Sequence, residues 1–123
     1  MKVLLSIKPQ FAEQIFSGVK KYEFRKTLFK RSNVDTIVLY VSSPIQRVLG
    51  EFKILSVLSN NPSDIWETTQ KESGITRDFF FDYFKDKEVA HAIEIGEVIR
   101  YHSPKFLLDY NIKHAPQSFR YLF

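Results

Sequence analysis

Residues 18–25 read GVKKYEFR, and this stretch decides how the chain is interpreted. It follows residues 9–17, where apolar side chains fall on one stripe of a helix. Gly18 stands where a helix prefers a left-handed C-terminal residue. Tyr22 and Phe24 alternate with charged residues, a pattern typical of a half-buried strand. Charged groups held on such a strand indicate a site that a ligand or a partner uses.

Strand geometry predicts how these charges are distributed, because successive side chains point to opposite faces. Lys21, Glu23 and Arg25 are expected on one face, while Lys20 at the turn can point either way. Two interpretations follow. Glu23 and Arg25 form an exposed ion pair worth about 0–1 kcal/mol, or Arg25 holds a phosphate or a base edge while Glu23 orients it.

The composition indicates one globular domain over residues 1–123. The chain has no cysteine, which excludes disulfides and thiolate metal sites and fits a cytoplasmic protein. The apolar run after Met1 is too short for a signal peptide, and no run approaches the roughly 20 residues of a membrane helix. His91, His102 and His114 are widely separated, so neither a metal site nor a cofactor is predicted.

The positive charge lies mainly in the first quarter of the chain. Residues 1–31 hold eight basic and two acidic side chains, whereas the remaining 92 residues hold ten basic and twelve acidic ones. A basic end on a near-neutral body suits a polyanion such as nucleic acid, although a solvated basic surface gives the same pattern.

The periodicity and turn residues predict an α+β fold, a small mixed β-barrel with helices inserted between its strands. Closure of the barrel removes exposed strand edges. The expected strands are 1–7, 21–25, 36–41, 48–57, 89–101 and one within the tail 115–123. The expected helices are 9–17, 61–74, one that begins after Thr76 with an aromatic face, and a short turn and helix from Pro104 to Leu108.

Several segments together resemble a known family. They are Gly18-x-Lys20-x-x-Glu23-x-Arg25, Tyr40–Pro44 with Val48–Phe52, Ile75–Phe79 and Ala115–Phe119. In this order they resemble the ASCH domains of the PUA-like superfamily over nearly the whole chain. The resemblance implies a pseudobarrel with helices at its mouth and a cleft lined by the GxKxxExR segment. It also implies binding of RNA or of a modified nucleoside or nucleotide.

The first hypothesis is therefore a domain that binds RNA or a modified nucleotide in a basic cleft. Trp66 and Tyr83 are candidates for base stacking, with core packing as the alternative. Ser42 and Ser43 could hydrogen-bond a ligand or simply form a turn. The full set of candidate binding residues is Lys20, Lys21, Glu23, Arg25, Ser42, Ser43, Trp66 and Tyr83.

The second hypothesis is a small hydrolase. Some relatives hydrolyse amides on N4-acylated cytidine, and others are described as nucleases, so a ribonuclease is included. The resemblance places the deacylases' catalytic lysine at Lys20, their threonine at Glu23 and their glutamate at Glu72. A carboxylate at position 23 is expected to keep Lys20 protonated, which opposes its use as a base.

The third hypothesis is a non-catalytic domain that binds a protein or DNA in transcriptional regulation. Its contact surface would be the basic loop that carries Lys26, Lys30 and Arg31.

Overall fold

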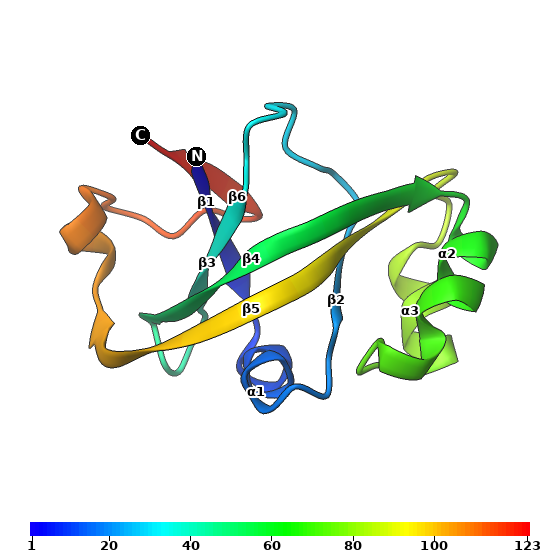
Figure 1. Cartoon of the computed structure of the whole chain (residues 1–123), viewed down its shortest axis with the longest axis horizontal. Helices are drawn as coiled ribbons and strands as arrows, with labels where there is room; N and C mark the ends of the chain where they lie inside the picture. Colours follow the sequence, from blue (N-terminus) through cyan, green and yellow to red (C-terminus); the bar gives the residue numbers. More distant parts are fainter.

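A six-stranded mixed sheet coils around the main core, with three α-helices at its ends (Figure 1). The computed structural model describes all residues from 1 to 123. The strands are β1 (Lys2–Ile7), β2 (Tyr22–Arg25), β3 (Thr36–Val41), β4 (Arg47–Asn60), β5 (Ala90–Lys105) and β6 (Phe119–Leu122). The helices are α1 (Pro9–Ser17), α2 (Pro62–Thr69) and α3 (Arg77–Tyr83), with 3₁₀ turns η1 (Gln70–Glu72) and η2 (Leu107–Tyr110).

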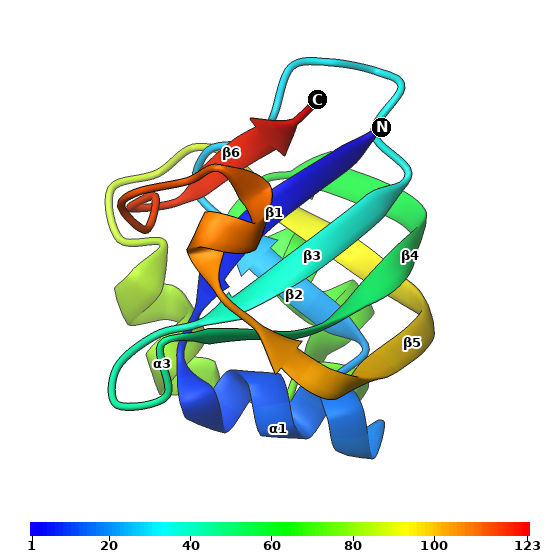
Figure 2. The same cartoon turned by 90° about the vertical axis from the view of Figure 1, so that its left-hand side faces the viewer.

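The strand order is β2-β5-β4-β3-β1-β6, and only β1 and β3 run parallel. The predicted α+β fold is thus confirmed, and the sheet curls into a half-barrel (Figure 2). The expected closure is wrong in its detail, because β2 and β6 remain edge strands without backbone pairing to each other. The open side between β2 and β1 is where the site described below lies.

Two long strands give the sheet its curvature. β4 and β5 pair antiparallel along almost their whole length, with three register shifts. The first lies at Gly50, where a Cβ atom would stand 2.4 Å from the carbonyl oxygen of Ile99. Both strands are longer than the sequence predicts, and Pro104 lies inside β5 rather than opening a turn.

Three clusters of buried side chains hold these elements together. The largest lies within the half-barrel and includes Phe52 and Ile93, neither of which is exposed. A second joins α2 and α3 to the sheet around Phe80, which is also fully buried. The third lies against the other face of β1 and β3 and includes Ile112. The aromatic face predicted for the helix after Thr76 therefore serves mainly as core.

The helix boundaries follow from local chemistry. Gly18 ends α1 with φ of 86°, a left-handed conformation that glycine adopts without steric cost. Asn61 and Thr76 cap α2 and α3 by accepting hydrogen bonds from backbone N–H groups within the first turn. None of the helices has the length and hydrophobicity that a membrane crossing would require.

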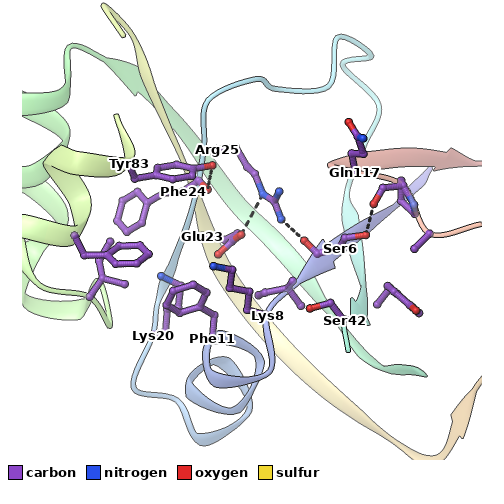
Figure 3. Close-up of a pocket in the computed structure, with 16 residues that line it drawn as sticks. Ser6, Lys8, Phe11, Lys20, Glu23, Phe24, Arg25, Ser42, Tyr83 and Gln117 are labelled. Carbon is purple, nitrogen blue, oxygen red and sulfur yellow. Dashed lines mark hydrogen bonds and ion pairs between the residues drawn. The ribbon is translucent and has the colours of Figure 1, made fainter. Parts of the chain in front are cut away.

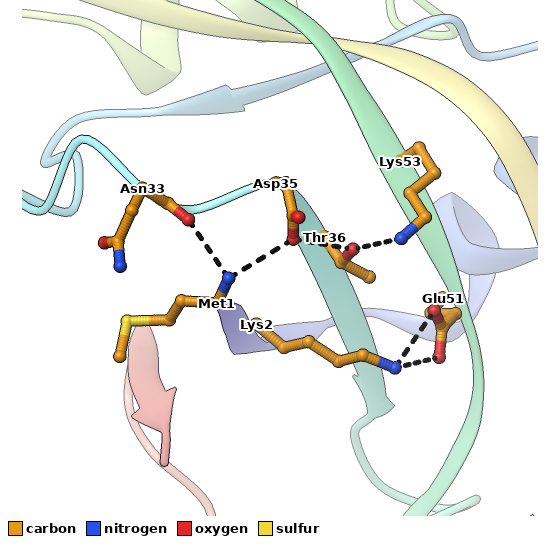
Figure 4. Close-up of polar contacts among 7 residues, drawn as sticks. All are labelled: Met1, Lys2, Asn33, Asp35, Thr36, Glu51 and Lys53. Carbon is orange, nitrogen blue, oxygen red and sulfur yellow. Dashed lines mark hydrogen bonds and ion pairs between the residues drawn. The ribbon is translucent and has the colours of Figure 1, made fainter.

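A polar network covers part of the outer face of the sheet (Figure 4). The Glu51 carboxylate accepts from Lys2 Nζ at 3.0 Å and from the Tyr101 hydroxyl at 2.6 Å. Burial alone would raise the pKa of Glu51, but these hydrogen bonds outweigh it and lower the pKa. Each charge in this network has a partner, so we assign it to stabilising the strands.

Candidate functional site

An open pocket of about 470 Å³ lies between edge strand β2 and the end of β1. Its walls come from β2, the β1–α1 junction, the end of β3, the start of α3 and residues 115–117 before β6. Three cationic side chains and one carboxylate line it, namely Lys8, Lys20, Arg25 and Glu23. Figure 3 shows these four groups pointing into the same space.

Arg25 spans the open side of the half-barrel. Its Nη2 donates to the carbonyl oxygen of Ser6 on β1 at 2.7 Å, and its Nε lies 3.1 Å from Oε2 of Glu23. The Nε–H is not directed at that oxygen and has no hydrogen-bond acceptor, so the contact with Glu23 is an ion pair only. The side chains of Arg25 and Glu23 are 12% and 8% exposed. Of the two interpretations, the exposed ion pair is wrong because both side chains are buried, and Arg25 links the two sides of the pocket.

Lys20 lies at the base of the pocket and is 2% exposed. Its Nζ donates to the carbonyl oxygen of Ser73 at 2.7 Å and lies 4.8 Å from the centre of the Phe24 ring. Gly74 permits this contact, because its φ of 72° turns the chain and a Cβ atom there would stand 3.0 Å from Cβ of Lys20. The ammonium makes no other hydrogen bond within the protein, so it retains N–H groups for a ligand.

Three effects act on the pKa of Lys20. Burial lowers the pKa of Lys20, and the neighbouring charge of Arg25 lowers it further. Glu23 opposes this shift, but its carboxylate pairs with Arg25 and forms no salt bridge with Lys20. Desolvation is therefore a larger effect on the Lys20 pKa than the Glu23 charge, which acts in the direction that the sequence predicts.

Aromatic side chains form the remaining wall and rim. Phe79 of α3 is 43% exposed and meets Phe11 of α1 edge to face at 5.6 Å. Tyr83 lies one turn further along α3, and Lys26 Nζ lies 4.6 Å from the centre of its ring. The pocket thus combines cations with an accessible aromatic surface, which suits a planar anionic ligand.

The structure brings some of the predicted residues together and separates others. Lys20, Glu23, Arg25, Ser42 and Tyr83 all line the pocket. The remaining candidates, which do not line it, are Lys21, Ser43, Trp66 and Glu72.

The residues outside the pocket have identifiable surroundings. Lys21 and Ser43 are exposed, and Trp66 packs on Phe80 with ring centres 5.0 Å apart. The exposed Glu72 contributes its backbone carbonyl, which accepts from the Lys21 N–H at 2.8 Å. The arrangement of Lys20, Glu23 and Glu72 around one ligand is therefore absent, and no group of three potential metal ligands is found.

Other pocket residues were not singled out from the sequence. Among the polar and aromatic ones they include Ser6, Lys8, Phe79 and Gln117. Ser6 and Gln117 are 111 positions apart and meet because β1 pairs with β6. The segment Ala115–Phe119 carried part of the family resemblance, and this was the available signal for Gln117.

The structure is thus a half-barrel with a cationic, aromatic pocket at its open side. The ASCH domain family model matches residues 5–100, and the chain belongs to this family.

Three proteins are similar to this chain in sequence or in structure. The chain is 34% identical over 121 residues to ATP synthase subunit alpha of Ureaplasma parvum, covering 98% of this chain but only 15% of that protein. It is 26% identical over 103 residues to the ASCH domain-containing ribonuclease of Zymomonas mobilis, covering 84% of this chain and 67% of that one. A crystal structure of a serine-to-alanine mutant of the Zymomonas mobilis ASCH protein superposes with a TM-score of 0.90 at 23% identity, covering 99% and 88% of the two chains.

We predict a strong energetic coupling between Arg25 and Glu23. Arg25→Met should lower the free energy of unfolding by about 3–5 kcal/mol, because it leaves the Glu23 carboxylate buried without its counter-charge. The double variant with Glu23→Gln should be less destabilised than Arg25→Met alone. Urea unfolding of the wild type, both single variants and the double variant gives the coupling energy.

The exposed pair Arg100–Glu13 is the matched control, with a separation of 3.2 Å and side chains 54% and 61% exposed. Its coupling should be about 0–1 kcal/mol. Equal coupling energies for the two pairs would show that burial of the Arg25–Glu23 pair has no energetic consequence.

Proposed function

We propose that this domain binds single-stranded RNA and holds one nucleotide in the pocket between β2 and β1. The observation that carries the proposal is the placement of Lys20 and Arg25 beside the exposed ring of Phe79 in one open cavity. The ribonuclease name of the Zymomonas mobilis relative supports RNA as the ligand class.

Each group has a role in this proposal. The free N–H groups of Lys20 and Arg25 donate to phosphate or base oxygens, and such charge-assisted hydrogen bonds are among the stronger polar contacts. The Glu23 carboxylate makes no hydrogen bond in the structure and is able to accept one from an exocyclic amine. Phe79 and Tyr83 supply stacking surfaces at the rim. The cavity is within the range of about 300–1,000 Å³ for small-ligand pockets.

Cleavage of the bound RNA is a second candidate, favoured by the lowered pKa of Lys20 and by the named ribonuclease relative. A neutral Lys20 would take the proton from a 2′-hydroxyl, whose oxygen then attacks the adjacent phosphorus as the 5′-oxygen leaves. Arg25 would stabilise the charge on the phosphorus centre. Deacylation of N4-acylated cytidine has less support, because position 23 lacks a hydroxyl and the Glu72 side chain lies outside the pocket.

Binding is tested at the rim. Phe79→Ala should weaken binding of a fluorescently labelled oligouridine by about tenfold or more, since stacking of one base is worth about 1–3 kcal/mol. Fluorescence anisotropy titrations measure the affinity. Leu55→Ala is the control, because Leu55 is 66% exposed on β4 and lies outside the pocket. Equal affinities for the two variants would place RNA binding elsewhere on the molecule.

Cleavage is tested by pH and by a charge-preserving variant. If Lys20 acts as the base, the rate should rise with pH through its lowered pKa and level off above it, because only the neutral amine accepts a proton. Lys20→Arg keeps the positive charge but cannot deprotonate at these pH values, so it should abolish cleavage.

The substrate for this assay is end-labelled RNA, with a 2′-O-methyl RNA of the same sequence as the uncleavable control. Cleavage by Lys20→Arg at the wild-type rate would exclude Lys20 as the base.

A further inference from the structure

A second group of cationic and aromatic side chains lies at the edge strand β6, outside the pocket. The Arg31 guanidinium is 5.2 Å from the ring centre of Tyr121 and 5.1 Å from that of Phe123. The Phe123 side chain is 93% exposed. We call these three residues the β6 clamp. No pocket residue is among them.

The loop that carries Arg31 is fixed in place over β6. The Tyr121 hydroxyl accepts hydrogen bonds from the backbone N–H groups of Lys30 and Arg31 at 2.8 and 3.2 Å. Two points of attachment, the hydroxyl contacts and the stacked guanidinium, hold the loop against the strand. Figure 2 shows this loop arching over the end of β6. The arginine is therefore positioned by the fold rather than free in solution.

Arg31 forms no salt bridge, in contrast to Arg100, which is paired with Glu13. The loop sequence from Lys26 to Val34 contains no acidic residue. Two of the five N–H groups of a guanidinium are enough for a bidentate contact with a phosphate, so Arg31 is available for one. A cation against aromatic rings, of which Phe123 is exposed and Tyr121 half-buried, is a combination that binds single-stranded nucleic acid.

The clamp is continuous with the pocket. Gln117 lines the pocket, and β6 begins two residues later and leads directly to Tyr121. At about 3.3 Å per strand residue, these four steps cover about 13 Å, which a few nucleotides of an extended strand can span. The basic loop connects the same two places, because Lys26 lies over Tyr83 at the pocket rim and Arg31 lies over Tyr121.

There is also space for a base beside the clamp. A second cavity of about 380 Å³ is bordered by residues 120–123 on one side and residues 109–112 on the other. Tyr121 and Phe123 are among the residues that border this cavity.

We infer that the β6 clamp binds a nucleotide flanking the one in the pocket, so that the domain holds single-stranded RNA along the path from α3 to β6. This inference rests on the proposed function. The pocket and the β6 clamp contribute differently to RNA affinity. The pocket binds one nucleotide of any RNA, whereas the clamp adds affinity only for strands long enough to reach β6.

The test compares two RNA lengths. Arg31→Ala should weaken binding of an oligouridine of about 12 nucleotides by about tenfold and leave binding of uridine monophosphate unchanged. The slope of log affinity against log salt for the longer RNA should fall by about 0.7, the value for one lost phosphate contact on a single strand. Phe123→Leu should weaken the longer RNA without changing that slope. The Arg100→Ala variant is the matched control, because Arg100 also lies over a ring, at 4.8 Å from Phe16, but is paired with Glu13.

The measurements distinguish failure of the β6 clamp from failure of the proposed RNA binding in the pocket. If Arg31→Ala and Arg100→Ala bind the longer RNA equally well while Phe79→Ala loses affinity, the clamp is overturned and the pocket proposal stands. If Arg31→Ala weakens the mononucleotide and the longer RNA equally, the clamp does not act as a separate subsite. If the wild type binds neither the oligouridine nor uridine monophosphate, both proposals fail.

Discussion

The contact between Arg25 and the Ser6 carbonyl compensates for the one place where the sheet is incomplete. Backbone hydrogen bonds join the strands in the order β2-β5-β4-β3-β1-β6, but none joins the two edge strands, β2 and β6. A single guanidinium spans this opening at 2.7 Å, with Glu23 beside it as the counter-charge. A cation on the edge strand therefore serves the fold where backbone pairing stops, and the gap between the strands becomes a pocket rather than a continuous barrel wall.

The same constraint gives the pocket its electrostatic character. Removing Lys20 from water is costly, and the Ser73 carbonyl and the Phe24 ring compensate only in part, which is why its pKa is lowered. Glu23 is occupied with Arg25 and does not restore the ordinary value. The pocket thus presents positive charge with unsatisfied donors on a rigid frame, an arrangement suited to bind an anionic ligand without reorganisation.

Much of this architecture was predictable from the sequence because local signals and global fold agree. Gly18 ends its helix and Thr76 begins one, as their conformational preferences require. The alternation of Tyr22 and Phe24 located β2, and the combined motifs identified the family.

What the sequence did not reveal is which of the polar groups become buried together. Period-two alternation predicts a solvated face for Glu23, but Glu23 is buried beside Arg25 in the wall of the pocket. The partner of Arg25 lies on another strand, Ser6, and Gln117 joins the site only through the pairing of β1 with β6. Contacts between residues so far apart in the chain produce no periodic pattern in the sequence. The length of β5 was underestimated for a related reason, since its exposed end is stabilised by pairing with β4 and not by an apolar pattern.

The most direct test of the account is an NMR titration of the ¹⁵N-labelled chain with uridine monophosphate. If the open side between β2 and β1 is the ligand site, backbone amide shifts should change at Ser6, Phe24, Phe79 and Gln117, which come from four separate parts of the chain. The amides around Glu51, on the polar outer face of the sheet, should remain unchanged. Shift changes confined to that outer face, with none at the four pocket positions, would contradict the account.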